Sequence, residues 1–106
     1  ADAYEHIGGT VYWAGKPHPS AYETAHAKAE AARGAKVERS RILAIGDAIR
    51  TDLKAAAGAG IDALFVTSGI HRAETMTGGS VDPEKLARAF GDGAPPAIAA
   101  TAFLDW

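Results

Sequence analysis

The chain has 106 residues, a formal net charge of −2 and no cysteine. This length suits one domain. The negative net charge excludes the strongly basic surface that is typical of proteins that bind nucleic acids or anionic membranes. Disulfides and thiolate metal sites are excluded as well. No apolar stretch approaches the roughly 18 residues of a membrane span, and no signal peptide is visible. We therefore expect a cytoplasmic protein that binds neither nucleic acid nor membranes.

Strands and helices are predicted to alternate along the first half of the sequence. Residues 10–14 are β-branched and aromatic, which predicts a strand. Alanine and tyrosine recur at helical spacing from Tyr22 to Ala32, and Gly34 follows, which predicts a helix that ends at about Arg33. Its start is left open between Pro19 as the first helical residue and a capping box of Ser20 with Glu23. Residues 41–46 contain a continuous apolar run, which predicts a short buried strand.

The second half continues the same alternation. Asp82 and Pro83 predict the start of a helix that ends near Phe90, because Asp is a preferred N-cap and Pro suits the first helical position. The remaining predicted elements are a helix from about residue 53 to Gly58 or Gly60, a strand over 63–67, a loop with one helical turn over 68–81, and a last strand over 97–100.

Continuous apolar strands between helices are typical of a parallel sheet that is covered on both faces. The predicted fold class is therefore α/β, a Rossmann-like three-layer α/β/α arrangement with a mostly parallel sheet. Residues 1–106 are interpreted as a single α/β unit.

Three charged residues follow the ends of two predicted strands: Lys16, Asp47 and Asp52. Lys16 and Asp47 are 31 positions apart, about one strand–helix–strand unit, and a right-handed crossover brings both to one rim of the sheet. Ligands bind at this rim in open α/β sheets. Magnesium takes one or two carboxylates, waters and phosphate oxygens, and an ammonium neutralises phosphoryl charge. The pattern therefore indicates a magnesium–phosphate site.

The segments Gly15-Lys16-Pro17-x-Pro19 and Ile45-Gly46-Asp47-x-x-x-Thr51-Asp52 resemble the third and fourth motifs of the haloacid dehalogenase (HAD) superfamily. The resemblance is strongest to class IIA, the NagD-like sugar-phosphate and nucleotide phosphatases. It implies aspartyl-phosphate chemistry with Mg²⁺ on a small phosphorylated metabolite. It also implies that Asp47 ligates the metal, that Asp52 holds the metal or its waters, and that Lys16 binds the phosphoryl group and the nucleophile.

The sequence departs from this family in one respect. Members carry their nucleophile and general acid as Asp-x-Asp on the first strand, and none of the 13 acidic residues here forms that motif. The cap domain has no counterpart either. We interpret the chain as the C-terminal part of a HAD core, inactive by itself, whose partner is the missing N-terminal segment of the same protein. The strand over 42–45 would then lack a neighbour and need another segment to cover its edge.

Further residues of the predicted rim have two interpretations each. His18 and Arg50 are candidates for binding substrate phosphate, against the alternatives of a solvent-facing histidine and a surface arginine. His71 is either a substrate contact or a loop histidine that faces solvent. Asp47 and Asp52 alternatively cap helices.

Two other functions stay open. One is a non-catalytic binding or scaffold domain that keeps a vestigial metal site. The other is an unrelated receiver-type domain that becomes phosphorylated. The receiver pattern has an acidic pair on the first strand and a later lysine, whereas here Lys16 precedes both aspartates, which counts against it.

Overall fold

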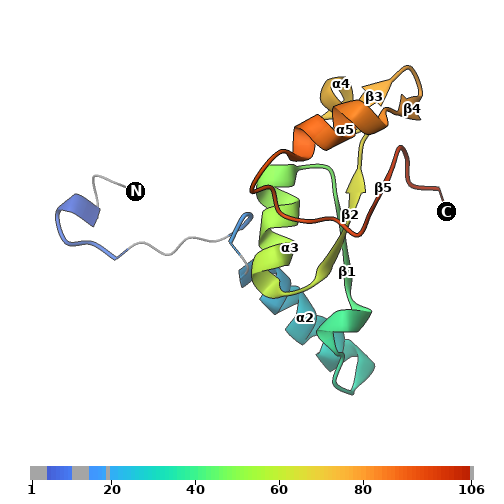
Figure 1. Cartoon of the computed structure of the whole chain (residues 1–106). Coiled ribbons are helices and arrows are strands. Elements are labelled where there is room, and N and C mark those ends of the chain that lie inside the picture. The colour runs from blue at the N-terminus through green and yellow to red at the C-terminus, as the bar shows by residue number, and fades with distance from the viewer. Residues whose placement is uncertain (1–4, 11–14, 19, 106) are drawn as a thin grey trace.

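The computed structural model describes residues 5–10, 15–18 and 20–105. The predicted strand over 10–14 falls almost entirely outside them. A 3-10 turn over Arg39–Arg41 precedes the sheet, and a π-helical turn over Ile49–Leu53 leads into the second helix. The helices are α2 (Ser20–Arg33), α3 (Lys54–Ala59), α4 (Arg72–Thr75) and α5 (Pro83–Phe90), and the strands are β1 (Leu43–Gly46), β2 (Asp62–Val66), β3 (Met76–Thr77), β4 (Ser80–Val81) and β5 (Ala99–Thr101) (Figure 1).

A parallel three-stranded sheet with the order β1-β2-β5 forms the centre of the fold. Ile45 of β1 lies opposite Leu64 of β2, and Phe65 of β2 lies opposite Ala100 of β5. Helix α3 connects β1 to β2, as parallel strands require a crossover. This arrangement confirms the predicted α/β class, with its Rossmann-like parallel sheet.

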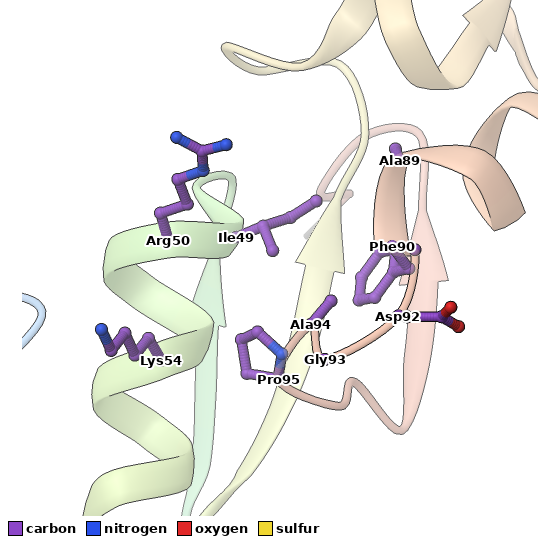
Figure 2. Close-up of a pocket in the computed structure, with 10 residues that line it drawn as sticks. Ile49, Arg50, Lys54, Ala89, Phe90, Asp92, Gly93, Ala94 and Pro95 are labelled. Carbon is purple, nitrogen blue, oxygen red and sulfur yellow. The ribbon is translucent and has the colours of Figure 1, made fainter.

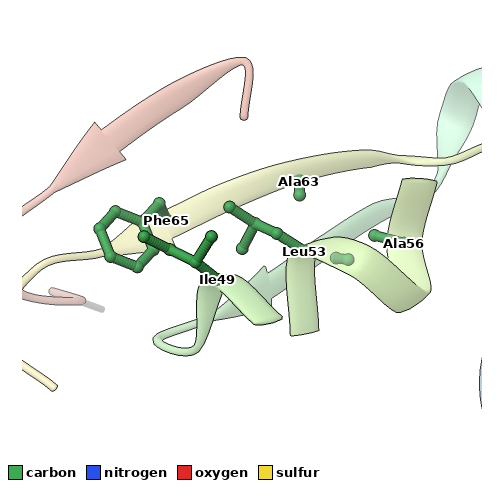
Figure 3. Close-up of a cluster of buried hydrophobic side chains, with 6 residues drawn as sticks. Ile49, Leu53, Ala56, Ala63 and Phe65 are labelled. Atoms are coloured by element: carbon green, nitrogen blue, oxygen red, sulfur yellow. The ribbon is translucent and has the colours of Figure 1, made fainter. Parts of the chain in front are cut away.

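The hydrophobic core lies between the sheet and α3 (Figure 3). Phe65 and Leu53 are fully buried, and the small side chains of Ala56 and Ala63 surround them. Phe90 of α5 packs edge-on against Phe65, with 5.2 Å between the ring centroids. Aromatic pairs favour this edge-to-face geometry, so α5 is held over the same core as α3.

The opposite face of the sheet is open in the part of the chain that the structure describes. Along β1 the side chains alternate, because Ala44 is buried whereas Leu43 and Ile45 are 46% and 43% exposed. None of the described helices covers these two residues, so the predicted second helical layer is not seen there. Large apolar side chains on a parallel sheet are usually covered by another element. Among the described strands, β1 has a neighbour on one side only, which is β2.

Two predictions of local structure were wrong. The loop over 68–81 contains, besides the expected helical turn α4, the antiparallel hairpin of β3 and β4, in which Met76 lies opposite Val81. Its strands have two residues each, too few for an alternating pattern to appear in the sequence. The start of the helix after β1 also differs, because a π-helical turn begins at Ile49 and the amide of Leu53 donates to the carbonyl of Ala48 at 3.2 Å.

The helix start at Asp82 is confirmed. Its carboxylate accepts hydrogen bonds from the amides of Glu84 and Lys85 at 3.1 and 3.2 Å, and Pro83 occupies the first helical position. The Thr77 hydroxyl, followed by these amides, lowers the pKa of Asp82. Among the residues with described positions, no helix combines the length and apolar character that crossing a bilayer would need.

Candidate functional site

Lys16 and Asp52 form an ion pair beside the carboxyl end of β1. Asp52 lies in the π-helical turn and is only 5% exposed, whereas the lysine side chain is half exposed. The hydrogen bond to Asp52 is the main cause that raises the pKa of Lys16, and the charge of Asp47 adds to it. Burial acts in the opposite direction but does not cancel this effect. The ammonium therefore stays protonated beside both carboxylates.

Asp52 also closes the turn that carries Asp47. Its Oδ2 accepts hydrogen bonds from the amides of Asp47 and Ala48, each at 3.1 Å. Gly46 leaves room for this contact, because a Cβ there would lie 2.4 Å from the Cβ of Asp52. A residue with any side chain would push Asp52 away. The turn from Gly46 to Asp52 is therefore closed by hydrogen bonds to one buried carboxylate, that of Asp52.

Tyr22 supports the same residue from α2. Its hydroxyl lies 3.4 Å from the carbonyl oxygen of Asp52, to which it donates. Burial raises the pKa of Tyr22, and the negative charge of Asp52 raises it further. The phenol consequently remains a donor, and α2 is tied to the turn at the rim.

Asp47 lies just past the end of β1, at the rim where the parallel strands β1 and β2 have their carboxyl ends. Its Oδ2 accepts a hydrogen bond from the amide of Ile70 at 3.1 Å. Gly69 approaches it closely, since a Cβ at that position would lie 2.1 Å from Oδ2. A hollow of about 270 Å³ opens beside the carboxylate, and its lining residues are Ile45, Gly46, Asp47, Val66, Ser68, Gly69 and Leu104.

The donor set fits a magnesium ion only in part. Among the described residues, no three His, Cys, Asp or Glu side chains converge, but Mg²⁺ needs just one or two protein carboxylates. Asp47 suits this role, because the described residues occupy only its Oδ2 and it lines the hollow. Both oxygens of Asp52 already accept hydrogen bonds, from Lys16 and from two amides. Asp52 is thus placed to orient Lys16 and the Asp47 turn.

The other two predicted phosphate ligands are Arg50 and His18. Arg50 is exposed and lines a separate cleft of about 590 Å³ beside Phe90, and its guanidinium points away from that ring (Figure 2). His18 lies two residues after Lys16, in a turn closed by a hydrogen bond from its amide to the carbonyl of Gly15 at 3.0 Å.

His71 is not the solvent-facing loop histidine of its second interpretation, because its side chain faces the protein interior, and the substrate contact stays a prediction. Its side chain is 19% exposed, and its Nε2 lies 3.4 Å from the amide nitrogen of Ile49. Sequence reasoning missed this contact with the Asp47 turn. The only signal for it was the position of His71, a few residues after β2 and so at the same rim.

Comparison with known proteins gives a consistent result. Residues 13–92 match a family model described as HAD-hydrolase-like. The crystal structure of a hydrolase of the haloacid dehalogenase-like family from Brucella suis 1330 is 38% identical, with a TM-score of 0.60. The match covers 93% of this chain and 33% of that one, so the chain spans about a third of its length. None of the curated proteins compared with the chain matches it. Because the family model covers well over half of the sequence, the chain belongs to the HAD-like hydrolase family.

Proposed function

We propose that this chain is part of a magnesium-dependent phosphatase of HAD class IIA, which hydrolyses a small phosphomonoester through an aspartyl phosphate. The observation that carries the proposal is the meeting of Lys16, Asp47 and Asp52 at one rim of a parallel sheet, from separate turns of the chain. Membership of the HAD-like hydrolases supports it. The assignment to class IIA rests on the two sequence motifs.

Each of the three residues has a separate task in this proposal. Asp47 ligates Mg²⁺, and Asp52 holds Lys16 and the Asp47 turn in place while it orders the waters of the metal. Bound Mg²⁺ would polarise the phosphoryl oxygens and neutralise part of their charge. Lys16 binds the phosphoryl group and the attacking carboxylate, and its protonated state suits it to oppose negative charge there.

His18 and Arg50 remain proposed contacts of the substrate. His18 is near Lys16 in the chain, and Arg50 belongs to the turn between the two aspartates. Substitution of Arg50 by alanine, with exposed Arg88 of α5 as the matched control, tests whether the separate cleft takes part in binding.

The proposal requires a nucleophilic carboxylate outside these residues, because the sequence contains no Asp-x-Asp. We assign it to an N-terminal segment of the same protein, next to the open edge of β1. In the described residues β1 pairs with β2 alone, which supports a segment at its other edge. The exposed Leu43 and Ile45 lie on a face of the sheet that further parts of such a segment would cover. The 106 residues by themselves would then be unable to form the covalent intermediate.

Hydrolysis of a generic phosphomonoester in the presence of Mg²⁺ tests the proposal. The chain alone should show no turnover, whereas a protein that also contains the N-terminal segment should be active. In the active protein, Asp47→Asn should abolish turnover, and Asp62→Asn, at an exposed position of β2, should leave it unchanged. Robust turnover by the 106 residues alone would contradict the assignment of the nucleophile.

A non-catalytic HAD-like scaffold with a vestigial metal site is the alternative. It is favoured by the fact that both oxygens of Asp52 are already occupied in the described structure. Calorimetry with Mg²⁺ separates the two functions. Binding that disappears in Asp47→Asn supports the phosphatase, and a protein indifferent to that substitution supports the scaffold.

A further inference from the structure

The turn Gly69–His71 contacts the Asp47 turn at two points. The amide of Ile70 donates to the Asp47 carboxylate at 3.1 Å. One residue later, Nε2 of His71 lies 3.4 Å from the amide of Ile49. Consecutive residues after β2 thus hold the side chain of Asp47 and the backbone two positions beyond it.

The His71 ring is itself fixed on several sides. It lies against the buried ring of Phe65, with 6.1 Å between the centroids. The carbonyl oxygen of His71 accepts hydrogen bonds from the amide of Glu74 at 3.0 Å and from the fully buried hydroxyl of Thr75 at 2.8 Å. The ring therefore has little freedom to leave the Ile49 amide.

These contacts select one tautomer of the neutral ring. The amide of Ile49 is a donor, so Nε2 must present its lone pair and the ring proton must lie on Nδ1. Nδ1 is buried without a hydrogen bond among the described residues, and the Glu74 carboxylate lies 3.5 Å from it. A proton on Nδ1 therefore lies near a negative group without a hydrogen bond to it.

We propose that His71, as the Nδ1–H tautomer, is a positioning residue that fixes the Asp47 turn and thereby the direction in which the Asp47 carboxylate meets Mg²⁺. This inference rests on the proposed metal role of Asp47. Residues that orient a metal ligand in this way commonly change metal affinity without touching the metal.

The tautomer is tested on the unmodified chain by two-bond ¹H–¹⁵N correlation spectra of its imidazoles at about pH 7.5, where an ordinary histidine is neutral. The expected result is a His71 ring protonated at Nδ1 alone. A proton on Nε2, whether alone or together with one on Nδ1, would overturn the proposal, because the Ile49 amide would then have no acceptor.

Two variants test the positioning role. His71→Gln keeps an acceptor near the place of Nε2, whereas His71→Leu removes it at similar size. We expect the ¹⁵N–¹H shifts of the Ile49 and Ile70 amides to move in the leucine variant and to return in the glutamine variant. His6→Gln, at an exposed position, is the matched control and should leave both shifts unchanged.

Titration with Mg²⁺ alone then measures the consequence. His71→Leu should raise the Mg²⁺ dissociation constant roughly tenfold, and His71→Gln should recover most of the affinity. Equal affinities of the parent chain and the leucine variant would overturn the positioning role. If the 106-residue chain binds no Mg²⁺, the proposed metal role of Asp47 fails, and with it the effect of His71 on the metal. The Ile70 amide then decides whether His71 positions the Asp47 turn: an unmoved shift in His71→Leu overturns this, and a moved shift supports it.

Discussion

The ammonium of Lys16 contacts the buried carboxylate of Asp52, 36 positions later in the sequence. The same carboxylate accepts hydrogen bonds from the amides of Asp47 and Ala48. The Asp52 side chain therefore joins the turn that contains Lys16 to the turn that follows β1. The two motifs that resemble HAD hydrolases are therefore one physical unit in this fold. Its stability depends on these few hydrogen bonds, and the proposed chemistry would use the same residues.

Replacing Asp52 by alanine should destabilise the fold. Two amides would lose their acceptor and Lys16 its counter-charge, so the free energy of unfolding should fall by roughly 2–4 kcal/mol. Urea denaturation followed by circular dichroism measures this. Asp62→Ala, at an exposed position of β2, should change the value by less than about 0.5 kcal/mol. Similar losses in both variants would show that the Asp52 contacts contribute little.

Gly46→Ala tests the close approach between β1 and Asp52. The added Cβ would lie 2.4 Å from the Cβ of Asp52, and such overpacking typically costs about 1–3 kcal/mol. Gly79→Ala is the control, because a Cβ there meets nothing within 4 Å. Thermal unfolding of both variants gives the comparison, and an unaltered midpoint for Gly46→Ala would contradict the described geometry.

The lowered pKa of Asp82 predicts a specific pH dependence. Because the folded-state pKa lies below the ordinary value of 3.8, the ionised cap stabilises the fold above that pH. This contribution is lost as the pH falls through the folded-state pKa. Asn is an equally good N-cap without a charge, so Asp82→Asn should lose less stability than the parent chain on acidification. Parallel pH profiles of the two proteins would refute this.

Lys16→Met should weaken binding of inorganic phosphate in the presence of Mg²⁺ by roughly tenfold or more, because a charge-assisted hydrogen bond is lost. The control is Lys28→Met, since Lys28 is exposed on α2. Calorimetric titration provides the affinities. Equal weakening by both substitutions would indicate that phosphate responds only to overall charge and not to the Lys16 position.

Local sequence signals determined much of this protein. The cap at Asp82, the end of α2 and the parallel pair of β1 and β2 all follow from short-range patterns, since capping, helical periodicity and apolar runs act over a few residues. The place of Asp47 at the rim also follows, because it comes directly after β1. The strand expected before Lys16 lies almost entirely outside the described residues.

Only the tertiary structure decided how these residues divide their tasks. Nothing in the sequence indicates that both oxygens of Asp52 accept hydrogen bonds, from Lys16 and from two amides. Nor does it indicate that the His71 ring lies against the amide of Ile49. The hairpin of β3 and β4 was likewise not predicted from the sequence. The physical reason is that the contacts of Lys16 and of His71 join segments 20 to 40 positions apart in the sequence. Packing against Phe65 and Leu53 fixes how such segments lie relative to one another, and a local sequence pattern carries no information about it.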